Sequence, residues 1–262
     1  MASLSTQTSS QASLGEHLSI RQAVARHKEI ADILTAEILL SQYRTGERLP
    51  SERDLSVRFS SNRGCIREAI KNLEQLGLVD VQPGGARVCS LERSSLDIIG
   101  HLLKLGEFPD PELVDDILEV MHSLLSLAVK RAMSRADEAM FARLETQVQI
   151  MLDTDTPAEH HMQARMELGR EFMQASGSLP LKLIAYALRL QFLDHLLPLV
   201  LDAGQNKNAH LTELKQLNKA LKIRDSKAVA SAMQSLFETS ASGIQKTLHS
   251  LRDTSAKQTV SR

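Results

Sequence analysis

Helical periodicity runs through almost the whole chain and gives way to a strand pattern only once. Between residues 26 and 76, apolar residues recur at intervals of three and four, as on one face of an α-helix. Over residues 78–89 the period changes to two on either side of the turn sequence QPGGA at 82–86. No convincing strand follows after residue 91. The pattern predicts a mainly α protein with one small β-hairpin.

Composition narrows the classes of protein that fit this pattern. The 262 residues are 42% hydrophobic, which is enough for a sizeable core and too much for a disordered chain. A formal net charge of −1 excludes a wholly basic, histone-like protein but not a local basic face. Aromatic residues make up 3%, which disfavours stacking on single-stranded bases and a large β-sandwich.

The cysteines and the lengths of the apolar runs indicate in which cellular compartment the protein is expected. Cys65 and Cys89 form no CxxC pair, so a thiolate metal site is not expected. The longest apolar run, Leu196–Leu201, is far shorter than the roughly 20 residues of a membrane span. The N-terminus shows no secretion signal. We therefore expect a cytoplasmic protein that enters no membrane.

The first part of the chain has the layout of a winged helix-turn-helix. Helices are predicted over residues 26–43, 51–59 and 63–76. Ser51 and Asn62 are favourable N-cap residues for the second and third helices, and Gly77 is suited to end the third. Three helices followed by a hairpin are typical of this fold.

The remainder is predicted to be an all-α bundle of seven helices with short connections. We place these helices near residues 95–105, 111–134, 136–152, 158–175, 180–202, 209–223 and 225–250. The domain prediction is a disordered tail at 1–25, a winged helix-turn-helix at 26–92, a helical domain at 93–252 and a second disordered tail at 253–262.

The third predicted helix has a basic outer face. Arg63, Arg67 and Lys71 are spaced four residues apart, opposite the apolar Ile66 and Ile70. Such a face is often simply solvated. Here it follows a short helix and a tight turn, an order that suits insertion into the major groove of double-stranded DNA.

Sequence motifs in this region resemble the GntR family of bacterial transcription regulators. They are RTGERLPSERDL at 44–55, NRGCIREAI at 62–70, LGL at 76–78 and the glycine pair at 84–85. The resemblance implies a homodimer on a near-palindromic operator, with arginines of these motifs on DNA and Gly84 at the tip of the wing. The candidate DNA-binding residues are Arg53, Asn62, Arg63, Gly64, Arg67, Lys71, Gly84 and Gly85. Asn62, Gly64 and Cys65 depart from the family pattern, which bears on the operator sequence.

The helical half resembles the FCD domain of the FadR branch of this family, most clearly over 95–105 and 113–120. Many such domains bind a metal through one Asp and three His. The corresponding positions here are Arg165, Gly169, Leu214 and Leu236, none of which ligates a divalent cation as the family does. We therefore predict no metal and no cofactor. The doublet His160-His161 is predicted to lie on the solvated surface.

The resemblance to FadR proteins implies a hydrophobic effector such as a long-chain acyl-CoA. The same residue types equally suit an ordinary core. The candidate effector pocket comprises Met121, His122, Leu125, Gly169, Leu214, Leu236, Glu238 and Thr239.

The sequence therefore predicts a dimeric DNA-binding regulator and no enzyme, since it contains no phosphate loop, nucleophile motif or metal constellation. Two alternatives remain open. One is a winged helix that binds protein, with the bundle as a dimerisation scaffold. The other is a regulator whose effector is a small carboxylate.

Overall fold

The computed structural model describes residues 26–202 and 210–260, and side chains over 26–191 and 210–254. The chain divides into two compact units, Met1–Leu102 and Leu103–Arg262, and each is described by itself. We call them the winged domain and the helical domain. The predicted N-terminal tail at 1–25 lies outside the described residues.

The winged domain contains the predicted three helices and hairpin. A helix over 26–39 is followed by α2 (Glu52–Arg58) and α3 (Arg63–Gln75). Strands β1 (Val79–Gln82) and β2 (Gly85–Val88) then form an antiparallel pair in which Val79 faces Val88. The sequence analysis is confirmed for this fold, and the first helix ends sooner than the predicted Tyr43.

Polar caps and a glycine set the limits of the short helices. The Ser51 side chain accepts a hydrogen bond from the Asp54 amide at the start of α2, and Asn62 accepts one from the Cys65 amide at the start of α3. Gly77, with a φ of +74°, lets the chain turn out of α3 because it has no Cβ to clash in the left-handed region. These three residues fix where α2 and α3 lie in the sequence.

The winged domain extends further along the chain than the predicted end at residue 92. After the single turn η1 (Leu91–Arg93), the short helix α4 (Ile98–Leu102) follows. Ile98 is buried in the same apolar cluster as Leu34, Ile66 and Leu73. Because α4 packs on this cluster, the chain divides after Leu102 rather than at the polar stretch before it.

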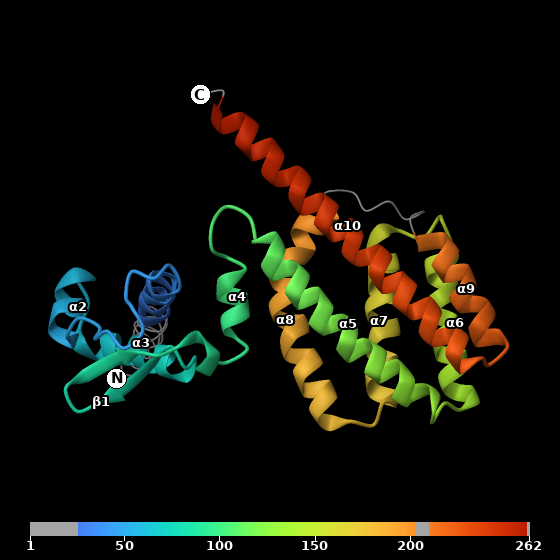
Figure 1. Ribbon diagram of the computed structural model, residues 1–262, viewed down its shortest axis with the longest axis horizontal. Helices are drawn as coiled ribbons and strands as arrows, with labels where there is room; N and C mark the ends of the chain where they lie inside the picture. Colours follow the sequence, from blue (N-terminus) through green and yellow to red (C-terminus); the bar gives the residue numbers. More distant parts are fainter. Residues whose placement is uncertain (1–25, 203–209, 261–262) are drawn as a thin grey trace, which may run out of the picture. The chain divides into compact units, whose positions relative to one another are not determined.

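In the part of the helical domain that the structure describes, six further helices follow (Figure 1). They are α5 (Pro111–Met133), α6 (Glu138–Leu152), α7 (Ala158–Ala175), α8 (Leu179–Asp202), α9 (Leu211–Lys222) and α10 (Ser226–Val260). All lie close to their predicted positions, so the all-α prediction is confirmed. The helix predicted at 95–105 is α4 of the winged domain instead. Helix α10 continues to Val260, so residues 253–260 are helical where a tail was predicted.

The core of the helical domain lies among α5, α6, α7, α9 and α10. Its fully buried side chains include Phe172, Leu144 and Leu214. Helix α8 packs on α5 and α7 at one side of this core. None of the helices that the structure describes is long and apolar enough to cross a membrane.

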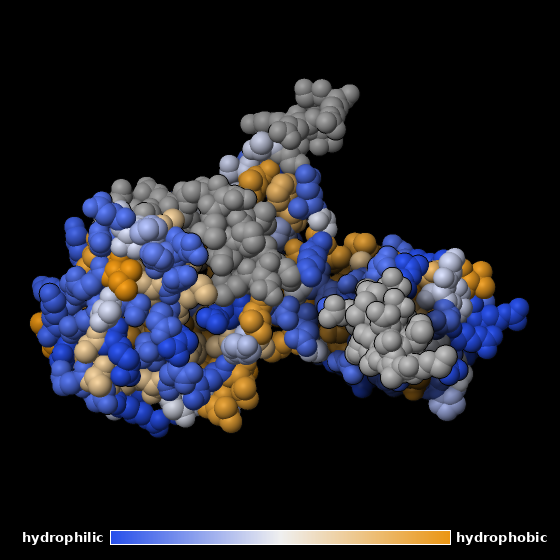
Figure 2. Space-filling model, turned by 180° about the vertical axis from the view of Figure 1, so that it is seen from behind, coloured by the Kyte–Doolittle hydropathy of each residue, from blue (hydrophilic) through white to orange (hydrophobic). Residues whose placement is uncertain are grey.

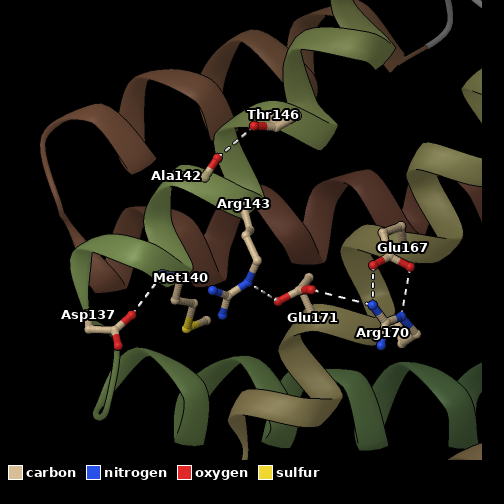
Figure 3. A network of polar contacts seen from close by, with 8 residues as sticks. All are labelled: Asp137, Met140, Ala142, Arg143, Thr146, Glu167, Arg170 and Glu171. Carbon is tan, nitrogen blue, oxygen red and sulfur yellow. Dashed lines mark hydrogen bonds and ion pairs between the residues drawn. The ribbon is translucent and has the colours of Figure 1, made fainter.

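A polar network ties α6 to α7 beside this core (Figure 3). The mostly buried Glu171 accepts a hydrogen bond from Arg143 Nε at 2.9 Å and lies 3.6 Å from Arg170. Arg170 also pairs with Glu167 one turn earlier, which lowers the pKa of that carboxyl. The mostly buried Glu171 carboxylate is thus paired with two arginines, as a buried charge requires.

Candidate nucleic-acid interface and ligand cavity

The outer face of α3 carries exposed cations, as the sequence predicts. Arg63 opens the helix and is exposed, while Cys65, Ile66 and Ala69 on the opposite face are buried. Arg53 on α2 is exposed as well, and neither arginine has an ion-pair partner among the described residues. Their guanidinium groups are free to bind an incoming phosphate or base edge.

The other two predicted cations have acidic neighbours. Arg67 Nε lies 2.9 and 3.0 Å from the carboxylate oxygens of Glu52 on α2, and Lys71 Nζ lies 2.7 Å from Glu68 one turn earlier. Both cationic side chains remain 62% exposed. Exposed pairs of this kind contribute little to stability. They hold the cations in place without removing them from solvent.

Asn62 and Gly64 act on the start of α3. The side-chain oxygen Oδ1 of Asn62 caps the helix by accepting a hydrogen bond from the Cys65 amide at 2.9 Å. A Cβ on Gly64 would lie 3.2 Å from that same oxygen. The glycine therefore leaves the cap unhindered. Both residues are exposed at the start of α3, next to Arg63.

The wing turn lies against an arginine for which the sequence analysis assigned no role. Gly84 and Gly85 have φ of +108° and +124°, and a Cβ on either would lie 2.8–3.0 Å from the Arg48 guanidinium. Arg48 is exposed, and its backbone pairs with Arg87 of β2. Arg48 stands in the motif at 44–55, but its approach to the wing tip depends on tertiary structure.

Arg58 has a structural role, although it belongs to the same basic stretch of sequence. Its guanidinium pairs with the buried Glu37 of the first helix, lies 3.3 Å from Tyr43 Oη and stacks over Phe59 at 4.7 Å. The hydrogen bonds with Glu37 raise the pKa of Arg58. This arginine therefore fastens α2 to the first helix.

We expect Gly85→Ala to disturb the wing. The substitution combines a positive φ with a Cβ 2.8 Å from Arg48 Nε, so it should cost about 1–3 kcal/mol in the winged domain. Gly46→Ala is the matched control, because Gly46 also has a positive φ (+82°) but nothing within 4 Å of the added Cβ. Urea unfolding followed by circular dichroism compares them. Equal destabilisation of both variants would contradict the role given to Arg48.

The helical domain contains a cavity of about 440 Å³ among α5, α7, α8 and α10. This volume falls in the range of small-molecule sites. Its wall is largely apolar, and five of the protein's nine methionines line it: Met121, Met162, Met166, Met173 and Met233. Methionine is flexible and polarisable, so such a wall adapts to the shape of an apolar ligand.

Half of the predicted pocket residues line this cavity. Met121, Leu125, Gly169 and Leu236 form part of its wall. Leu214 is fully buried in the core of the domain instead.

The three polar candidates lie elsewhere. His122 stacks on Phe237 at 4.8 Å and lines a smaller neighbouring hollow. Glu238 is exposed and bonds Gln234. Thr239 donates to Glu213 at 3.1 Å.

A polar cluster lies at one part of the cavity wall. Arg165 lines the cavity and donates from Nη1 to Ser240 Oγ at 2.8 Å, while its Nε has no hydrogen-bond acceptor among the described residues. The Nε atom of Arg165 is buried, and the residue as a whole is only partly exposed. This burial lowers the pKa of its guanidinium to about 10.

Two histidines and a glutamate belong to the same cluster. Burial, followed by the nearby Arg165 charge, lowers the pKa of His210 to about 4. His161 and Glu213 also act on His210 electrostatically. His161 is buried, so the prediction of a solvated surface doublet is wrong for this residue and holds only for His160. The sequence analysis missed this cluster because its members come from three helices.

The positions that correspond to the family's metal ligands do not fit a metal. Arg165 presents a cation, and Gly169, Leu214 and Leu236 have no donor atoms. Among the side chains that the structure describes, no three of His, Cys, Asp or Glu are grouped as a metal site requires. These four positions therefore provide no ligand set for a metal ion.

Comparisons with protein-family models bear on both domains. The model described as "Bacterial regulatory proteins, gntR family" matches residues 26–88, and the model of the FCD domain matches residues 116–239. The first match covers the first helix, α2, α3 and the two strands of the wing. The second covers most of the cavity wall.

Relatives over most of the chain are named as regulators. A transcriptional regulator from Mycobacterium tuberculosis, Rv0494, is 27% identical over 82% of this chain and 87% of its own. The repressor NanR from Edwardsiella tarda is 27% identical over 87% of this chain and 90% of its own. A fatty acid metabolism regulator protein from Erwinia tasmaniensis is 27% identical over 53% of this chain and 57% of its own.

Among solved structures, the protein Lar, described as controlling expression of the Listeria monocytogenes agr system, shares the fold. The match has a TM-score of 0.51 at 15% identity and covers 84% of this chain and 96% of that one.

Proposed function

Because the chain is a GntR-family regulatory protein that carries an FCD domain, we propose that it binds an operator as a homodimer and responds to a hydrophobic effector. The observation that carries the DNA-binding part is the exposed cationic face of α3, with Arg63 and Arg53 unpaired among the described residues and the Arg48 guanidinium close to the wing turn. This is a regulator rather than an enzyme, acting in the cytoplasm.

A mobility shift tests the DNA-binding part. The probe is DNA selected by the full chain from a random pool, together with the DNA immediately upstream of its own gene. Because Lys and Arg side chains displace counterions from phosphates, the affinity should fall steeply as salt rises. Recovery of no common sequence, or a complex insensitive to salt, would favour a winged helix that binds protein.

Helix α8 carries an apolar stripe suited to pairing with a second copy of the chain. Leu179, Leu183, Tyr186 and Leu190 are spaced by four, three and four residues and are 40–63% exposed. This spacing is that of a coiled-coil seam, and an apolar stripe of this kind is seldom left in water. Figure 2 shows hydrophobic surface at the lower edge of the helical domain, where α8 begins.

We expect Leu183→Glu to convert the dimer to a monomer, because it places a charge in the apolar stripe. Light scattering with size-exclusion chromatography measures the mass. Ile223→Glu is the matched control: Ile223 is 62% exposed, close to the 60% of Leu183, but caps α9 rather than lying on α8. A wild-type monomer, or a Leu183→Glu variant that remains dimeric, would contradict this interface.

The effector site is proposed to be the cavity, and Gly169 offers a way to block it. A Cβ at Gly169 meets nothing within 4 Å, so a larger side chain there has room to enter the cavity without clashing in the core. Gly169→Leu should therefore keep operator binding and abolish release by ligand, whereas Gly169→Ala should retain both. Loss of operator binding in Gly169→Leu would show damage to the domain instead.

A further inference from the structure

The charged side chains that line the cavity, among the residues whose side chains the structure describes, are all cationic. They are Arg165, Arg170, Lys182 and Arg189. Arg170 is exposed and already paired with Glu167, and Arg189 acts electrostatically on that same carboxyl. Arg165 differs from Arg170 because its Nε is buried without a hydrogen-bond acceptor and no ion pair is formed with a carboxylate among the described residues.

The surroundings of Arg165 leave part of its guanidinium unsatisfied. Arg165 Nη1 donates to Ser240 Oγ, and the Ser240 hydroxyl in turn donates to the Leu236 carbonyl at 2.7 Å. The Nε–H group is buried and has no acceptor in the part of the chain that the structure describes. A buried charge without a counterion is costly, and a bound anion would remove that cost.

From this arrangement we infer that the effector is an amphipathic monocarboxylate whose head group binds the Arg165 guanidinium and whose apolar chain lies among the cavity methionines. The inference rests on the proposed effector role of the cavity and names the ligand class. Guanidinium and carboxylate match as a pair of parallel hydrogen bonds, and the free Nε–H supplies one of the donors.

The same geometry disfavours an acyl-CoA. In such a thioester, the negative charges lie on the nucleotide end, and the acyl chain that would enter the cavity is neutral. A neutral chain would leave the Arg165 charge unpaired. Phosphates would instead rely on the other lining cations, Lys182 and Arg189. The two ligand classes therefore depend on different residues.

Direct binding to the full-length protein without DNA tests the inference, by titration calorimetry with decanoate, 1-decanol and decanoyl-CoA. We expect decanoate to bind more tightly than the other two. Arg165→Met should weaken decanoate about 10- to 100-fold, as expected when a hydrogen-bonded charge partner is lost. Lys222→Met is the control, because Lys222 is exposed on α9 and does not line the cavity, and it should change decanoate affinity less than twofold.

The stability of the Arg165→Met variant provides a second readout. Since Met has a similar length and no charge to desolvate, the ligand-free variant should melt higher than wild type, by roughly 2–10 °C. If Arg165 had only a structural role, the Arg165→Met variant would melt at a lower temperature than wild type.

Other outcomes overturn the inference. These are equal affinity for decanoate and 1-decanol, decanoyl-CoA binding that depends on Arg189 rather than Arg165, or no binding of any of the three. This assay contains no DNA, so its result does not depend on operator binding. A failure of the effector inference can therefore be distinguished from a failure of the DNA-binding proposal.

Discussion

The variants Arg63→Ala and Arg67→Ala are each expected to lose about 1–3 kcal/mol of operator affinity if the arginine reads a base. Both side chains project from the exposed face of α3, and an arginine there reaches a guanine edge with two hydrogen bonds. If either contacts only a phosphate, the loss should be uniform across DNA sequences, and the salt dependence should weaken by about one counterion. Mobility shifts on cognate and scrambled DNA at several salt concentrations separate the two cases.

Glu52 gives this prediction a control of opposite sign. Its carboxylate binds Arg67 Nε at 2.9 Å and competes with DNA for that side chain. Glu52→Gln should therefore strengthen or preserve operator binding, while Arg67→Ala weakens it. If Glu52→Gln weakens binding as much as Arg67→Ala does, the ion pair itself organises the interface.

A further control removes two cations from the other domain. Lys219 and Lys222 are exposed on α9, so Lys219→Ala/Lys222→Ala lowers the charge of the chain without touching α3. Its operator affinity should stay within twofold of wild type. Unchanged affinity for both arginine variants would remove α3 as the recognition helix.

The helices of the winged domain were predictable from sequence because residues close to each helix end determine where it begins and ends. Ser51 and Asn62 cap α2 and α3 through their own side chains, and Gly77 turns the chain at positive φ. Each feature is readable in a few neighbouring residues. The end of the domain was not, because Ile98 joins the core through contacts with residues far away in sequence.

The cavity was predictable only in part, for a geometric reason. Leu214 and Leu236 have the same residue type and both are buried, but Leu236 lines the cavity and Leu214 fills the core. Periodicity shows that a helix face is buried and does not show against what. Arg165 was recognised only as a residue unfit for a metal. Its enclosure depends on α10, where Ser240 meets it.

We expect His210 to make the helical domain lose stability as the pH falls below about 6.5. Burial and the Arg165 charge lower the pKa of this imidazole from 6.5 to about 4 in the folded protein. His161 acts in the same direction, and Glu213 opposes it. The folded state therefore keeps His210 neutral under conditions where the unfolded chain takes up a proton.

The sign follows from this difference in proton binding. Above pH 6.5 neither state binds the proton, and His210 has no effect on the free energy of unfolding. Between about pH 6.5 and 4, the unfolded state alone binds it, so stability falls progressively, by about 2–3 kcal/mol in total. Below about pH 4 both states are protonated, and the contribution of His210 stops changing.

Urea unfolding measured by far-UV circular dichroism between pH 7.5 and 4.5 checks this expectation, since the chain has no tryptophan. Carboxylates titrate in the same range, so the comparison is with His210→Gln, which cannot take up the proton. The wild type should lose about 2 kcal/mol more than this variant over that interval. His160→Gln, which replaces the exposed neighbour of His161, should follow the wild type. Parallel pH profiles for wild type and His210→Gln would mean that His210 stays accessible to protons in the folded domain.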